Sequence, residues 1–199
     1  MSKNRLEAFS DGMFAIILTI LVLELHIPNL PDSSFAVFAS AILGLAPKFL
    51  SFLFSFFIIA IFWVNHHHMV HLIERVDTKL LWLNIALLFF ACLFPFLTAF
   101  VGDYPMNPYV VALYPLNMAC SAAAMGALWK HAFVDSNLAP NKFTTAQQQK
   151  RVKQDRTAAL INLGAAALAF IWVPITLVII MLMPFVFVVP ELMANPTEK

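Results

Sequence analysis

Long apolar runs separated by short polar segments dominate the chain. A single helix over the last run, 157–189, would be about 50 Å long against a hydrocarbon core of about 30 Å, so we divide this run near Trp172 and Pro174. One strongly tilted span is the alternative. The pattern predicts an all-α integral membrane protein, a single domain over residues 1–199. Its six expected transmembrane helices cover residues 6–25, 48–65, 80–101, 107–130, 157–172 and 174–189.

Two further segments are not expected to cross the membrane. The apolar stretch 33–45 would cover about 20 Å as a helix, so we expect it at the outer interface or packed over the bundle. Residues 131–156 are the one long polar segment and are predicted to form a cytoplasmic loop with some helical character. A proline at position 95 predicts a kink in the third span.

Composition and charge support a membrane location and give its orientation. Only 12% of residues are charged, against about 25% in soluble proteins. With the N-terminus inside, all of the 12 Lys and Arg residues except Lys48 fall on the cytoplasmic side. This asymmetry predicts cytoplasmic N- and C-termini. The net charge of +1 argues against nucleic acid as a partner.

The first apolar run contains a polar cluster near its inner end. Asp11 lies about one turn inside the run, preceded by Ser10 and Arg5. An ionisable group in a membrane helix is costly, so it is usually paired and turned away from lipid. Asp also has too short a side chain to reach the interface easily. We therefore predict a satisfied polar network whose partners are Trp82, Asn84 and His66 or His67.

The same run carries an aliphatic stripe. At 100° per residue, Ile16, Ile20 and Leu23 fall within an arc of about 60°, with Thr19 beside Ile16. Any membrane helix offers such a stripe to lipid or to the core. Spacing alone therefore does not assign these residues to a pore.

The sequence contains no motif that indicates a catalytic site or a metal site. No nucleophile has a nearby base, and the isolated glycines form neither a phosphate loop nor a potassium filter of backbone carbonyls. The histidines at 66, 67, 68 and 71 point in different helical directions, without a Cys or carboxylate at ligand spacing. We predict no enzymatic activity, no metal site and no cofactor. The alternative function is a proton-coupled secondary transporter that uses Asp11 and the His66–His71 cluster, although no inverted repeat supports it.

Several motifs together resemble one protein family. Arg5-x-x-x-Phe9-Ser10-Asp11, followed by Ala-Ile-x-x-Thr19, is similar to the signature first helix of the transmembrane protein 175 family of lysosomal and bacterial potassium channels. Further blocks resemble its bacterial members. They are Phe62-Trp63-x-Asn65-His66-His67, Leu81-Trp82-x-Asn84 and Phe94-Pro95-Phe96-x-Thr98. The resemblance covers roughly the first half of the chain.

The resemblance implies a six-helix subunit that assembles as a homotetramer, with the first helix lining a central pore. It places the gate and constriction at Ile16, Ile20 and Leu23, with Thr19 as a hydroxyl linked to selectivity. It gives the structural network as Arg5, Phe9, Ser10, Asp11, His66, His67, Trp82 and Asn84. The implied function is a modestly selective channel for K⁺ over Na⁺ in a bacterial plasma membrane. Rb⁺ and Cs⁺ are further candidate ions, and membrane lipids are the remaining partners.

Overall fold

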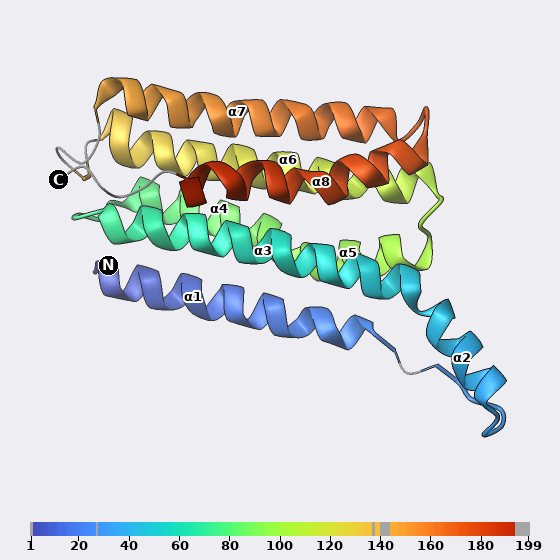
Figure 1. The fold of residues 1–199 in the computed structure, drawn as a ribbon. Coiled ribbons are helices and arrows are strands. Elements are labelled where there is room, and N and C mark those ends of the chain that lie inside the picture. Colours follow the sequence, from blue (N-terminus) through green and yellow to red (C-terminus); the bar gives the residue numbers. More distant parts are fainter. Residues whose placement is uncertain (1, 27, 137, 140–143, 194–199) are drawn as a thin grey trace.

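The computed structural model describes residues 2–26, 28–136, 138–139 and 144–193, the last ten of them by their backbone. All secondary structure in these residues is helical. Long helices lie side by side in a bundle, and a short helix, α2, projects from one end (Figure 1). The start of α1 and the α3–α4 connection lie at the opposite end of the bundle.

The first two helices differ in how they meet the bundle. α1 spans Lys3–Ile20 and continues as a short 3₁₀ helix, η1, over Leu21–Glu24. α2 spans Phe35–Gly44, and the side chain of Ser34 caps its first turn by accepting from the Val37 amide. None of the α2 residues is buried. The short apolar stretch is therefore a helix, as predicted, but it does not pack over the bundle of its own chain.

The third predicted span is broken into two helices. α3 spans Ala46–Leu72, α4 spans Thr78–Cys92 and α5 spans Phe94–Asp103. The break falls beside Pro95, where a kink was predicted, because proline has no amide hydrogen to donate to the preceding turn. The Phe90 carbonyl at the break accepts from the Leu93 amide at 3.2 Å and from the Asn117 side-chain amide at 3.1 Å.

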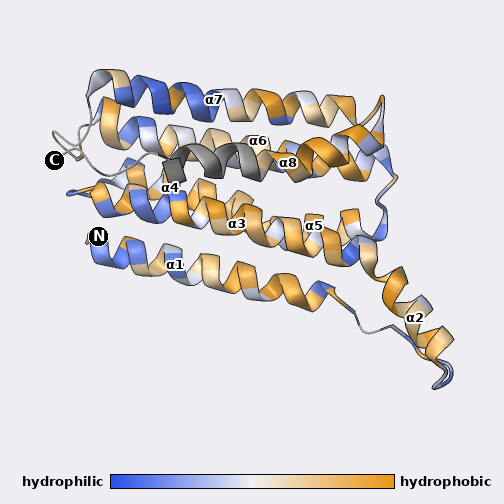
Figure 2. Ribbon diagram, viewed as in Figure 1, coloured by the Kyte–Doolittle hydropathy of each residue, from blue (hydrophilic) through white to orange (hydrophobic). Residues whose placement is uncertain are grey.

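The second half of the chain is helical over much of the predicted loop. α6 spans Pro108–Lys130, a π-helical turn follows over His131–Asp135, and α7 spans Thr145–Leu168. The helical character expected in the segment 131–156 is present over 131–135 and 145–156, and its place on the cytoplasmic side stays a prediction. A capping box at Thr144 starts α7, and its polar first half continues without interruption into the apolar second half (Figure 2). α8 spans Val173–Met193, so the chain turns close to the point where the apolar run was divided.

Among the described residues, four segments are long and apolar enough to cross a membrane: Lys3–Glu24, Ala46–Leu72, Thr78–Asp103 and Pro108–Asp135. They contain the first four predicted spans to within one residue at either end. The apolar part of α8 in which side chains are described, Val173–Met183, is shorter, and α7 is polar over its first half. Six spans therefore stay a prediction.

The core has two apolar clusters, one toward each end of the bundle. The cluster at the end that holds the start of α1 contains Leu6, Leu80 and Leu128. The other contains Phe14, Phe94 and residues of α3, α6 and α8. α1 contributes to both clusters, so its orientation about its own axis is fixed along its length.

Candidate functional site

The first helix has two distinct faces. Its buried residues recur every three or four positions, which is one face of a helix, and are Leu6, Ser10, Phe14, Ile17 and Leu21. The predicted stripe lies about 110° around the helix from the centre of this buried face. Ile16 is 55% exposed, Ile20 is 39% exposed and Leu23 is 70% exposed. None of the three belongs to the two apolar clusters of the core.

The stripe is apolar along its length except for one hydroxyl. Residues three apart nearly eclipse in a 3₁₀ helix, so η1 places Leu23 above Ile20. From Ile16 to Leu23 the stripe extends about 12 Å along the axis. Thr19 is exposed and donates its hydroxyl hydrogen to the Ile16 carbonyl at 2.8 Å. The hydroxyl oxygen keeps lone pairs that can accept from, or coordinate, a group outside the helix.

A buried chain of hydrogen bonds attaches the N-terminal half of α1 to α3 and α4. The Asn84 side-chain amide on α4 donates to the Ser10 hydroxyl at 3.0 Å. His66 Nε2 on α3 lies 2.7 Å from Asn84 Oδ1 and donates to it, because an amide oxygen only accepts. All three side chains are fully buried. Three helices are thus joined through one amide, and the structure brings together Ser10, Asn84 and His66 of the expected network.

Asp11 has a different partner from the one predicted. Trp63 on α3 donates its indole N–H to Asp11 Oδ1 at 2.9 Å. Trp82 is 67% exposed and is not brought to this network within the chain, so its part in the network stays a prediction. The reason is helical direction: Trp82 precedes Asn84 by two positions, about 200° around α4, whereas Trp63 precedes His66 by three and shares its face.

Two other motif residues lie outside the network within this chain. Arg5 and Phe9 are both exposed on α1. The N-terminal end is instead attached by Lys3, whose amine donates to the His71 carbonyl at 2.6 Å. The implied role of Arg5 and Phe9 in holding α1 to the other helices therefore stays a prediction.

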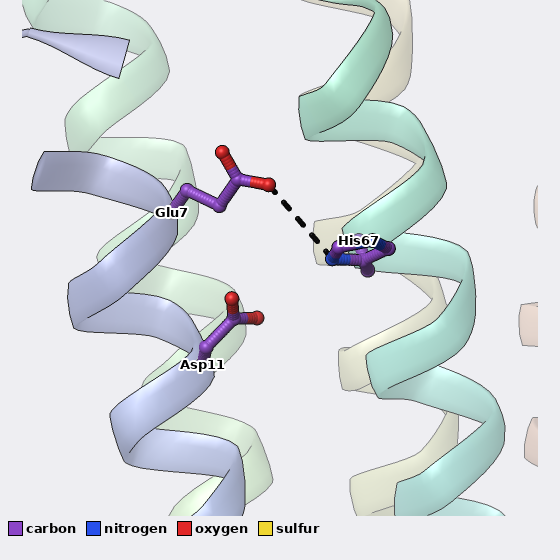
Figure 3. A group of neighbouring side chains, drawn as sticks. All are labelled: Glu7, Asp11 and His67. Carbon is purple, nitrogen blue, oxygen red and sulfur yellow. Dashed lines mark ion pairs between the residues drawn. The ribbon is translucent and has the colours of Figure 1, made fainter. Parts of the chain in front are cut away.

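A cluster of ionisable side chains that the motifs did not indicate lies beside Asp11. Glu7 and Asp11 are one turn apart on α1, and both project toward His67 on α3 (Figure 3). His67 Nδ1 is 3.9 Å from Glu7 Oε1, and ligand atoms of all three groups lie within 4.8 Å of one another. No carboxylate lies at ligand spacing along α3, but the fold brings two from α1. The spacing of four residues between Glu7 and Asp11 is the signal in the sequence.

A second buried polar group ties the other end of the bundle. Thr98 on α5 donates to the Ser55 hydroxyl on α3 at 2.6 Å, and Ser55 lies 2.8 Å from the Tyr114 hydroxyl on α6. Thr98 belongs to the sequence motif Phe94-Pro95-Phe96-x-Thr98, whereas no motif indicates Ser55 and Tyr114 as its partners. Both polar groups are turned inward, so neither interrupts the exposed stripe of α1.

Comparison with known proteins gives consistent matches. A family model described as "Endosomal/lysosomal potassium channel TMEM175" matches residues 5–95. A protein of Chamaesiphon minutus named as a potassium channel is 36% identical over 171 residues, which is 84% of each chain. A crystal structure of a lysosomal potassium-selective channel TMEM175 homolog from the same organism superposes with a TM-score of 0.83 at 32% identity. It covers 95% of this chain and 97% of that one.

Other relatives match over shorter lengths. A protein of a Chryseobacterium strain, also named as a potassium channel, is 43% identical over 126 residues, which is 62% of each chain. A mouse protein named as the endosomal/lysosomal proton channel TMEM175 is 34% identical over 112 residues. This chain spans only 20% of the mouse protein.

Proposed function

This chain belongs to the TMEM175 family of ion channels, and on that premise we propose that it conducts monovalent cations, K⁺ more readily than Na⁺, through the central pore of a homotetramer. The chain is a multi-pass membrane protein of a channel family, not of an enzyme family. The proposal adds six spans per subunit, cytoplasmic termini and a location in a bacterial plasma membrane.

The exposed aliphatic stripe of α1 is the observation that carries the proposal. The buried network and the apolar core hold another face of this helix, so the stripe is presented outward in a fixed orientation. Around a fourfold axis, Ile16, Ile20 and Leu23 would form three stacked hydrophobic rings. Such a constriction blocks ions by dewetting when it is narrow and passes them when it widens.

The same surface supports a modest preference for K⁺. An aliphatic ring supplies no ligand oxygens, so a passing ion must keep or shed its water without direct replacement. K⁺ sheds water at a lower cost than Na⁺, and a narrow ring therefore favours K⁺. Four Thr19 hydroxyl oxygens would lie between the rings of Ile16 and Ile20 as the nearest polar atoms.

Flux measurements on purified protein in liposomes test this proposal. We expect the rate of K⁺ flux to exceed the rate of Na⁺ flux. Valinomycin makes every vesicle permeable to K⁺ and so gives the maximum K⁺ signal. Replacing Ile16 with Asn should raise the leak by about tenfold, equivalent to a barrier lower by roughly 1.4 kcal/mol, and reduce the preference for K⁺. Ile161→Asn, at a 44% exposed position on α7, makes the same change away from α1 and should leave flux unchanged.

Two outcomes would contradict the proposal. Unchanged flux and selectivity in Ile16→Asn, at equal reconstitution, would remove Ile16 from the constriction. Flux that saturates with ion concentration and requires a proton gradient would instead support a coupled transporter. Because the mouse relative is named as a proton channel, proton flux should be recorded in the same vesicles.

A further inference from the structure

We propose that Glu7, Asp11 and His67 form a binding site for a divalent transition-metal ion such as Zn²⁺, which ties the inner end of α1 to α3. The three side chains come from two helices and converge on one point (Figure 3). The proposal concerns contacts within one subunit and does not depend on conduction.

The donor set fits zinc better than the hard cations. Zinc binds both imidazole nitrogen and carboxylate oxygen, and its catalytic sites combine three protein ligands with a fourth position for water. Ca²⁺ and Mg²⁺ prefer six or more oxygen ligands, and the cluster offers fewer. The two carboxylates also balance the charge of a divalent ion, so the bound site would be close to neutral.

The geometry needs only a small adjustment. Ligands of tetrahedral zinc are about 3.3 Å apart, as follows from bond lengths of about 2.0 Å. The His67 Nδ1 to Glu7 Oε1 distance of 3.9 Å is about 0.6 Å longer, and the other ligand pairs lie within 4.8 Å, so side-chain rotations that close the cluster by at most about 1.5 Å would suffice. The Glu7 and His67 side chains are partly exposed, so the cluster borders on solvent although His67 Nδ1 itself is covered.

Neighbouring groups already orient the ligands. Trp63 donates to Asp11 Oδ1, which fixes the carboxylate and leaves Oδ2 for a metal ion. The Trp63 ring lies 5.5 Å from the His67 ring and restrains its plane. His67 Nδ1 is shielded from solvent and has no hydrogen-bond partner in the described structure, although it faces the Glu7 carboxylate. Such outer contacts are the usual supports of a metal ligand.

Titration of the purified, tag-free protein with Co²⁺ and Zn²⁺ tests the proposal. Tetrahedral Co²⁺ gives strong visible absorption bands, and we expect these bands to appear on binding and to disappear when Zn²⁺ displaces the ion. Glu7→Gln and His67→Gln keep the side-chain size and should each weaken Zn²⁺ binding by at least about tenfold. His68→Gln alters the adjacent, exposed histidine and should bind as the wild type does.

Thermal unfolding provides the second measurement. Zn²⁺ should raise the unfolding midpoint of the wild type and of His68→Gln, because it binds the folded state, and should raise that of Glu7→Gln by less at the same Zn²⁺ concentration. The midpoints without metal show whether each variant is folded. Unchanged Zn²⁺ affinity in both cluster variants would overturn the proposal, as would an equal loss in His68→Gln, which would indicate adventitious binding to surface histidines.

Discussion

Removal of the Asn84 amide is the sharpest test of how α1 is held. Asn84→Ala deletes two hydrogen bonds, to Ser10 at 3.0 Å and from His66 at 2.7 Å. It leaves the Ser10 hydroxyl and the His66 imidazole buried without these partners. The change is confined to one side chain that joins three helices, so its cost reports directly on the network.

The expected magnitude follows from the two groups left behind. A buried polar group that loses its partner costs about 1–3 kcal/mol, so two cost roughly 2–6 kcal/mol. Couplings measured within membrane proteins are smaller, about 0.6 kcal/mol on average and up to about 1.7, because the unfolded chain in lipid finds other partners. We therefore expect Asn84→Ala to lower the free energy of unfolding by about 2–3 kcal/mol. Its coupling to Ser10→Ala should be about 0.6–1.7 kcal/mol.

The assay is a double-mutant cycle on Asn84→Ala and Ser10→Ala. Unfolding by dodecyl sulfate in mixed micelles, at one fixed protein concentration, gives the four free energies. Ser121→Ala is the matched control, because this buried hydroxyl donates to the Asn117 carbonyl of its own helix. Its coupling energy with Asn84→Ala should be zero within error. If Ser10→Ala costs the same with and without Asn84, the proposed bond does not hold α1 and the reasoning fails.

Two further predictions concern contacts away from α1. Partial burial raises the pKa of Asp77, but a hydrogen bond from an amide in the first turn of α4 and the contact with His131 outweigh it, so this pKa lies below its usual value. A carboxyl with a lowered pKa stabilises the fold above its unfolded pKa and loses this effect as the pH falls through its folded pKa. The unfolding midpoint of the wild type should therefore drop below about pH 4 more steeply than that of Asp77→Asn, and equal slopes would contradict this. A Cβ at Gly126 would lie 2.9 Å from Asp155 Cβ, so Gly126→Ala should force α6 from α7 and cost about 1–3 kcal/mol in the same micelle assay. Gly164→Ala, which meets nothing within 4 Å, should instead stabilise by about 0.5–1 kcal/mol, and a gain at both positions would refute the close packing of α6 and α7.

The hydropathy of the chain predicts most helices but not all of their limits. Apolar runs identify the first four spans because a segment in lipid must satisfy its backbone as a helix. They do not mark the start of α7, which begins well before its apolar half, although helical character was expected in this polar segment. Hydropathy reports where a helix meets lipid, whereas the capping box at Thr144 reports where the helix starts. That signal, a Thr three residues before Gln147, was present in the sequence.

The sequence indicated which residues would take part in the buried network better than it indicated which of them would bond to one another. Ser10, Asn84 and His66 could be identified because buried polar side chains in a membrane protein need partners. The choice between Trp63 and Trp82 as the donor to Asp11 depended on how α3 and α4 are rotated about their axes. A single sequence does not specify that rotation.

The break between α4 and α5 divides one membrane span into two rigid pieces with separate attachments. Below the break, α4 is bonded to α1 and α3 through Asn84, and above it α5 is bonded to α3 and α6 through Thr98. The extra bond from Asn117 to the Phe90 carbonyl satisfies the backbone at the joint, so the span can bend there without exposing a bare polar group to lipid. A tilt of α1 would therefore act on α4 through the hydrogen bond at Asn84 and on α5 through apolar contacts only, so the two pieces would follow that movement to different degrees.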